Sequence, residues 1–160
     1  MPHFKDPVGN LHFIDDVEFA NLLPVGSVQI TDTEAAAINA PTLEQVKARV
    51  WEAIKAERDR RKAGGVKVGA KWFHSDDGSR IQQMGLVMMG ASIPANLKWK
   101  TMDGTFITMT QTLASQVFQA VAASDQAVFT AAETHRVAME ASADPAAYDY
   151  STGWPKVYGE

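Results

Sequence analysis

The residues best suited to chemistry in this sequence are its four histidines, His3, His12, His74 and His135. No two of them have the spacing that places metal ligands on one helix face, and no H-E-x-x-H motif occurs. His3 and His12 could meet across a hairpin and bind a metal ion. Two ligands make only a weak site, so we interpret this pair as polar residues on a solvent-facing surface.

The run His74-Ser75-Asp76 contains the three residue types of a hydrolytic triad. Triads are assembled in space from separated segments, with the base oriented by a carboxylate. Ser75, Asp76 and Asp77 fit the start of a helix better, as capping residues. His135 falls on an apolar stripe and is interpreted as a hydrogen-bonded core or edge residue.

Carboxylate pairs offer the other route to catalysis. A hydrolase acting on surface glycans needs two carboxylates that converge on a cleft. Glu133 and Glu140 lie two turns apart on one predicted helix and cannot flank a substrate in that way. Asp15-Asp16 and Asp76-Asp77 do not belong to a calcium-binding loop, and no phosphate-binding glycine loop occurs. We therefore predict no catalytic residue, no metal site and no cofactor, and expect a protein that is not an enzyme.

The amino-acid composition further limits the class of protein and its partners. The 160 residues are 46% hydrophobic and 21% charged, as in ordinary globular proteins. The absence of cysteine excludes disulfides and thiolate chemistry. A net charge of −4 argues against nucleic acid as a partner, and we interpret the basic run from Arg58 to Lys62 as a solvated helix end. No signal peptide is visible and no apolar run approaches the ~20 residues of a membrane span, so we expect no membrane partner.

Residues 1–40 are expected to form a small segment of hairpin and short helices. Residues 4–6 and 11–14 predict a hairpin that turns at 7–10, with Phe4, Leu11 and Phe13 on its apolar face. Asp15 or Asp16 caps a short helix that ends before Pro24, and residues 27–31 predict a strand. The Thr31–Glu34 capping box opens another short helix.

Residues 42–141 predict an α+β domain of three main helices and two hairpins. Capping residues and apolar periods place the helices near 43–63, 76–90 and 111–141. The hairpins turn at Gly69-Ala70 and Asp103-Gly104, and the Asp-Gly pair predicts a type I′ turn with Trp99 and Phe106 facing each other. Two sets of residues are expected to face inward: Ile81, Met84, Leu86 and Met88 on the second helix, and Leu113, Val117, Val121, Val128, Ala132, His135 and Met139 on the third.

Residues 142–160 form a C-terminal tail rich in aromatic residues. Tyr148, Tyr150, Trp154 and Tyr158 lie beyond the last periodic helix, in a stretch that Pro155 and Gly153 keep extended. Exposing aromatic rings of this size to water is unfavourable, so we expect other side chains to cover them. They pack either on the chain's own helices or on a partner, which could be a second copy of this chain, and we predict them as partner-binding residues.

Several motifs resemble a family known from tailed bacteriophages. They are Trp72-Phe73-His74-Ser75-Asp76, Ser79-Arg80-Ile81-Gln82, Trp99-Lys100-Thr101-Met102-Asp103-Gly104 and Thr108–Leu113. Over residues 42–141 this pattern resembles a phage domain of uncharacterised function. The opening, with Phe4-Lys5-Asp6, Leu22-Leu23-Pro24 and Val28–Asp32, resembles the N-terminal segment of phage tail-fibre assembly proteins.

The resemblance implies a protein–protein interaction role in building or decorating a tail fibre, and it carries no catalytic residue. We expect a chaperone-like assembly protein that binds the fibre protein in the host cytoplasm and shields its β-rich tip, because exposed strand edges aggregate. The alternative is a structural component that remains in the virion, attached to the tail or fibre.

Overall fold

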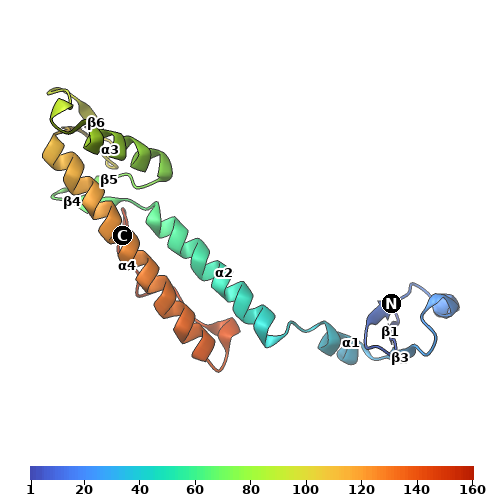
Figure 1. Ribbon diagram of the computed structural model, residues 1–160. Helices are drawn as coiled ribbons and strands as arrows, with labels where there is room; N and C mark the ends of the chain where they lie inside the picture. The colour runs from blue at the N-terminus through green and yellow to red at the C-terminus, as the bar shows by residue number, and fades with distance from the viewer. The chain divides into compact units, whose positions relative to one another are not determined.

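The computed structural model describes residues 1–160 and divides into two compact units, Met1–Gln45 and Val46–Glu160 (Figure 1). The division lies a few residues after the predicted hinge at Ala40–Thr42, and the tail from residue 142 belongs to the second unit. Helices and small antiparallel sheets give the α+β class that the sequence predicts. None of the helices combines the length and the apolar character needed to cross a membrane.

The N-terminal unit is a three-stranded antiparallel sheet with two short helices. Its strands are β1 (His3–Lys5), β2 (Leu11–Phe13) and β3 (Val28–Ile30), in the order β2-β1-β3. Asp16 caps the 3-10 helix η1 (Val17–Leu22), and Thr31 with Glu34 forms the predicted capping box of α1 (Asp32–Asn39). Local cap chemistry therefore sets these helix starts, as expected from the sequence.

The predicted apolar face of the first hairpin is wrong. Phe4 pairs with His12, whereas Phe13 pairs with His3, and Leu11 pairs with Lys5. Because paired residues share a face and neighbours along a strand alternate, Phe4 points away from Leu11 and Phe13. Phe4 is 7% exposed, while Phe13 is 67% exposed.

The C-terminal unit contains the three predicted helices and two predicted hairpins. The helices are α2 (Leu43–Lys62), α3 (Asp77–Met89) and α4 (Gln111–Ala141), and short 3-10 turns follow as η2 (Gly90–Ser92) and η3 (Pro145–Ala147). Strands β4 (Val66–Val68) and β5 (Lys71–Phe73) form one hairpin, and β6 (Lys98–Lys100) and β7 (Phe106–Thr108) form the other. Thr42, Asp76 and Thr110 accept the capping hydrogen bonds that begin the three helices.

The turn between β6 and β7 is not the predicted type I′ turn. A type I′ turn needs positive φ at both central residues, but only Gly104 has one, at 82°. The Thr101 carbonyl accepts from the Gly104 amide and the Thr101 amide donates to the Thr105 carbonyl, which makes a longer loop with a glycine bulge. Trp99 faces Ile107, and Phe106 points away, 66% exposed.

One hydrophobic core lies where α3, α4 and the two hairpins meet. Its buried side chains are Val66, Phe73, Leu86, Met109, Ala114, Val117 and Val121. The predicted stripe of α4 is therefore confirmed, except that Leu113 is only half-buried. The predicted inward face of α3 is confirmed only for Leu86.

The other three residues predicted to face inward from α3 lie on its surface. Ile81 is 67% exposed, Met84 48% and Met88 81%. Gln83 takes the buried position instead, because its side-chain amide donates to the carbonyl of His74.

The second core lies between α2 and α4, which run antiparallel. Val50 and Ile54 of α2 pack with Ala132 and Met139 of α4. At one end the Lys47 ammonium donates to the Glu140 carbonyl over 2.8 Å, and further along the Arg58 guanidinium lies 4.8 Å from the Phe129 ring centre. This core is completed by aromatic residues of the C-terminal tail.

Arg80 joins three segments where the two cores meet. Its guanidinium donates to the carbonyls of Lys62 and Ser75 and forms a two-pronged ion pair with Asp125 of α4. The sequence suggested that Ser75 caps α3, and this is wrong. Its buried hydroxyl instead donates to the Lys62 carbonyl and accepts from the Gly65 amide. The end of α2 is thus fixed to α3 and α4 by hydrogen bonds.

Candidate functional site

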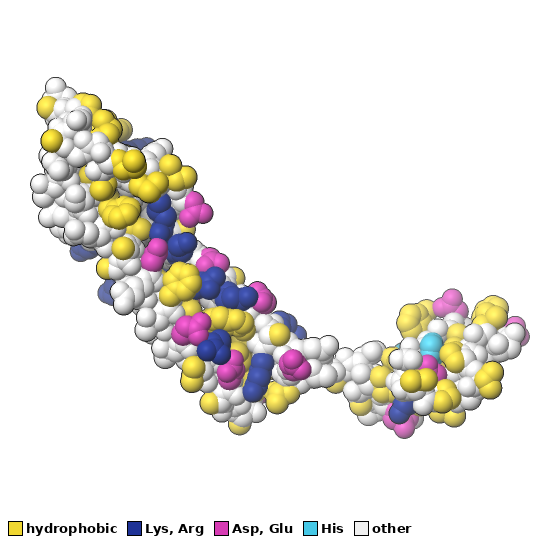
Figure 2. All heavy atoms as spheres, in the orientation of Figure 1, with side chains coloured by type: hydrophobic (Ala, Val, Ile, Leu, Met, Phe, Trp, Pro, Cys, Tyr) yellow, Lys and Arg dark blue, Asp and Glu magenta, His cyan; other side chains and the backbone are white.

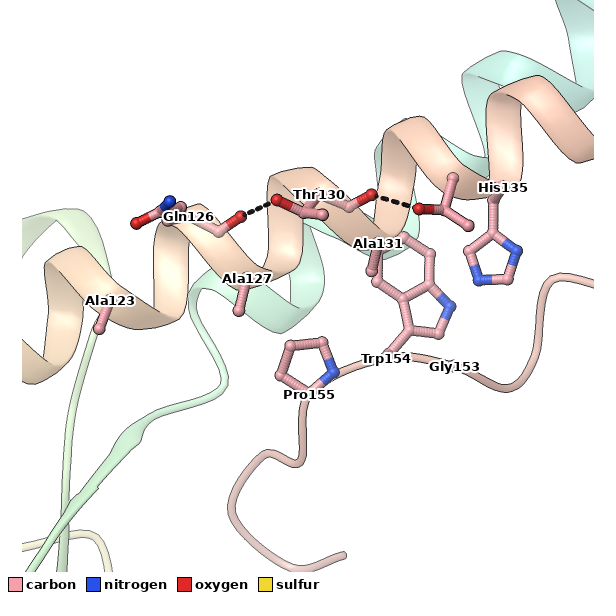
Figure 3. Close-up of a pocket in the computed structure, with 10 residues that line it drawn as sticks. Ala123, Gln126, Ala127, Thr130, Ala131, His135, Gly153, Trp154 and Pro155 are labelled. Carbon is pink, nitrogen blue, oxygen red and sulfur yellow. Dashed lines mark hydrogen bonds between the residues drawn. The ribbon is translucent and has the colours of Figure 1, made fainter.

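The C-terminal tail folds back along the body of the second unit. Asp144 caps η3, whose Pro145 is buried. The chain then returns past α4, where the Trp154 indole lies close to Ala131 and His135 (Figure 3). Near its end the Tyr158 amide donates to the Gly64 carbonyl, and Val157 is 5% exposed.

His135 of α4 holds this tail through both ring nitrogens. Nε2 lies 2.8 Å from the carbonyl oxygen of Thr152, and Nδ1 lies 2.9 Å from the Tyr148 hydroxyl. Because a carbonyl can only accept, Nε2 carries a proton and donates to it, and in the neutral ring Nδ1 then accepts from the hydroxyl. The Trp154 ring packs on the same imidazole with 5.0 Å between ring centres. Both nitrogens are engaged, so the ring serves structure here, as the sequence suggested.

Arg61 holds the tail from the α2 side. Its side chain is 9% exposed, and the guanidinium donates to the Pro155 carbonyl, to Glu57 and to Glu160. Hydrogen bonds from Arg60 and then Arg61 lower the pKa of Glu57 to about 2. The interpretation of this basic run as a solvated face is therefore wrong for Arg61, whose charge is used to anchor a segment 94 residues away.

The four aromatic residues predicted to bind a partner differ in their surroundings. Tyr148, Tyr150 and Trp154 are half-buried and pack against the core between α2 and α4. Tyr158 is 41% exposed and meets Trp72 edge-on, with 6.1 Å between ring centres. The chain's own helices thus supply much of the cover that the sequence required. Contact of these rings with a partner stays a prediction.

A groove of about 640 Å³ runs between α4 and the tail. Figure 3 shows Ala123, Ala127 and Ala131 on one side, with Trp154 and Pro155 on the other. The hydroxyls of Thr130 and Thr134 donate to carbonyls one turn earlier on α4. Apart from Gln126, the polar side chains that line the groove are thus already hydrogen-bonded within the chain, which suits packing rather than reaction chemistry.

The remaining candidates for chemistry do not converge. His3 and His12 lie on opposite faces of the first hairpin, so they cannot meet across it. No group of three or more potential metal ligands forms. Glu133 and Glu140 both bind Arg136, with shortest distances of 2.7 Å and 3.1 Å.

The N-terminal unit carries a surface that the sequence reading missed. Between residues 8 and 28, seven large apolar side chains are about half exposed or more, from 49% for Phe19 to 98% for Val25. We call them the N-terminal apolar surface: Val8, Phe13, Val17, Phe19, Leu22, Val25 and Val28. Figure 2 shows hydrophobic side chains spread over the visible face of this unit. Only Phe4 and Ala35 are buried hydrophobic residues there.

Both edges of the N-terminal sheet are open, because β2 and β3 each pair only with β1. The turn between β1 and β2 is held by Asp6, whose carboxylate accepts from His12, from the Asn10 side chain and from the amides of Val8 and Asn10. These hydrogen bonds, that of His12 foremost, hold the pKa of Asp6 well below its usual range. A charged network thus fixes the shape of a unit that has little apolar core.

Comparison with known proteins places the chain in a family. Residues 45–152 match the family described as "Domain of unknown function (DUF4376)", and since this is more than half of the chain, the chain belongs to that family. The match covers most of residues 42–141 and continues into the tail. No curated protein and no solved structure matches. The family's description names no activity or partner.

Proposed function

We propose that this member of the DUF4376 family is a phage tail-fibre assembly protein, a chaperone-like protein that binds the fibre protein through its N-terminal unit. The observation that carries the proposal is the N-terminal apolar surface beside two open strand edges. Exposed large apolar side chains gathered within one small unit favour a site of protein interaction there.

The energetics of the N-terminal unit favour a protein partner. A segment of 45 residues with two buried apolar side chains gains little from its own core. Covering a side chain such as Val25 or Leu22 stabilises a complex by roughly 1.5–3 kcal/mol for each fully buried residue. Binding therefore offers this unit the apolar burial that its fold lacks.

Open strand edges favour a β-rich partner. An extended segment can add to β2 or β3 by main-chain hydrogen bonds, while alternate side chains contact the face that carries Phe13 and Val28. A β-rich fibre tip that has not yet assembled would present unpaired strand edges of this kind. The resemblance of residues 1–34 to the N-terminal segment of tail-fibre assembly proteins supports this choice of partner.

Co-purification with the fibre protein of the phage or prophage that encodes this chain tests the proposal. Val28→Glu places a charge on the N-terminal apolar surface, and Val137→Glu is a matched control on α4. The two valines are 58% and 59% exposed, so neither change disturbs a core. We expect Val28→Glu to abolish co-purification and Val137→Glu to preserve it. Equal binding by both variants would show that the N-terminal unit does not contact the fibre.

The chaperone role has a further consequence for the mature particle. A chaperone leaves before the virion is complete, whereas a structural component stays. Quantitative mass spectrometry of purified virions is expected to find the fibre protein without this chain. A stoichiometric amount of this chain in the particle would instead establish the structural alternative.

A further inference from the structure

A second apolar groove lies in the C-terminal unit, between α3 and α4. It has a volume of about 240 Å³ and is lined by Ile81, Gln83 and Met84 of α3 and by Phe118, Val121 and Ala122 of α4. Ile81, Met84 and Phe118 are 67%, 48% and 43% exposed, so the rim is apolar and uncovered. Methionine side chains are flexible and polarisable and adapt to the shape of what they contact.

Gln83, one of the residues that line the groove, has an unsatisfied polar atom. Gln83 is 1% exposed, and its Oε1 has no hydrogen-bond partner. The other atom of the amide, Nε2, donates to the His74 carbonyl over 2.7 Å. That contact fixes the orientation of the amide, because a flipped amide would set two acceptors against each other. Gln83 therefore keeps a buried acceptor without a donor, which is unusual in a folded protein.

The chemistry of the groove selects one kind of occupant. Its volume lies below the range of sites for drug-sized ligands, so it suits a single side chain. Arg80 and Asp125 at its edge neutralise each other in an ion pair, so nothing there favours a charged group. Tryptophan and tyrosine are the large side chains that combine an apolar body with one neutral donor.

We propose that the α3–α4 groove binds a tryptophan or tyrosine side chain of a partner protein, whose N–H or O–H donates to Gln83 Oε1. Because this oxygen is closed to solvent in the structure, binding requires a side chain at the groove to move, and the flexible, half-exposed Met84 is the one best suited to do so. Aromatic anchors that fill a pocket and satisfy a buried polar atom dominate many protein interfaces. The site is in the C-terminal unit and does not depend on the proposed contact between the N-terminal unit and a fibre.

Nuclear magnetic resonance of the ¹⁵N-labelled full chain tests this site, with N-acetyl-tyrosine amide as the probe. We expect saturable shifts of the Gln83 side-chain amide and of the Ala122 backbone amide. N-acetyl-phenylalanine amide lacks the ring donor, so its affinity should be about two- to tenfold lower, the range that one net hydrogen bond supplies.

Two variants in which phenylalanine replaces an alanine locate the binding site. Ala122→Phe fills the groove with a ring and should abolish the shifts. Ala56→Phe adds the same ring to an exposed position on α2 that lines neither groove, and should leave them unchanged. The spectra of both variants also report whether the fold is kept.

Four results would overturn the proposal. They are the absence of saturable shifts, equal affinity for the two amides, shifts that persist in Ala122→Phe, and loss of the shifts in a folded Ala56→Phe. Shifts of the same residues that depend on protein concentration, without any probe, would mean that a second copy of this chain fills the groove. They would overturn the proposal that the occupant belongs to another protein.

Discussion

His135 links the C-terminal tail to α4, although histidine is a residue type often associated with catalysis. Its two ring nitrogens contact Tyr148 and Thr152, and Trp154 packs on the ring. The apolar stripe predicted a buried or edge histidine at this position. The partners of the ring could not be predicted, because they come from a segment with no periodic pattern.

Replacing His135 by alanine should destabilise the C-terminal unit by about 1–3 kcal/mol, because the Tyr148 hydroxyl and the Thr152 carbonyl lose their partner. Urea denaturation measures the loss, and hydrogen exchange should show faster opening of residues 148–154. His74→Ala is the control, since the structure shows a hydrogen bond only to the backbone carbonyl of His74 and none to its ring. An equal effect of both substitutions would contradict the assigned role of His135.

Glu57 makes the anchoring of the tail depend on pH. Its pKa is about 2 in the folded protein, against an ordinary value of 4.5. A carboxyl group whose pKa falls on folding stabilises the fold above its unfolded pKa, and that contribution is lost as the pH falls through the folded pKa. Stability should therefore decline between about pH 4.5 and pH 2.

Glu57→Gln should flatten this part of the profile, since glutamine does not titrate. Denaturation midpoints measured at several pH values across the window check the expectation. Glu44→Gln, at the exposed first turn of α2, should keep the original profile. A Glu57→Gln profile as steep as that of the unmodified protein would show that other carboxylates control acid unfolding.

Among the elements, α3 shows where prediction from hydrophobic periodicity fails. Its limits were predicted closely, because Asp76 caps its first turn and Gly90 ends it, and both signals are local. Its buried face was predicted wrongly, because a glutamine satisfied by the His74 carbonyl occupies a core position. Ile81 and Met88 lie on the surface instead. A hydrophobicity pattern cannot predict this, because it does not show which polar side chains form hydrogen bonds in the core.

The C-terminal tail is the element whose removal should lower the stability of the fold most. Truncation after Ala143 removes Tyr148, Tyr150 and Trp154 from the core between α2 and α4. Each ring contributes up to about 1.5–3 kcal/mol when fully buried, and about 1 kcal/mol shifts the melting temperature by ~4 °C in a domain of this size. We expect a sharp fall in melting temperature, measured by circular dichroism. Lys156→Ala, an exposed change in the same segment, should have little effect.

For the whole molecule, the two units differ in how much apolar surface they bury. Pro41 and the capping box of Thr42 and Gln45 predicted a hinge at Ala40–Thr42, and the division between the two units lies a few residues later, after Gln45. The pairing of β3 with β1 could not be read from local signals, because it joins segments on either side of η1. The N-terminal apolar surface was missed for a related reason, since exposure depends on this three-dimensional arrangement.

A fragment that begins at Pro41 keeps the α2 cap and both cores, so it should fold independently. Its melting temperature should be close to that of the C-terminal unit in the full chain, and the two ¹⁵N spectra should overlay for residues 46–160. The peptide Met1–Ala40 should remain largely unfolded alone, because it buries only Phe4 and Ala35 as apolar side chains. A fragment that unfolds cooperatively at a much lower temperature would contradict the separation into units.

The anchoring of the tail to Arg61 also has a consequence for biosynthesis. Pro155 follows Arg61 by 94 residues, so at ~5–20 residues per second the ribosome adds the anchor on the order of ten seconds after α2. During that interval Val50, Ile54 and Trp51 of the nascent chain lack the aromatic cover that they have in the folded protein. Completion of this unit is thereby timed by translation, and slow codons between residues 62 and 148 would prolong the exposure of α2 to cellular chaperones.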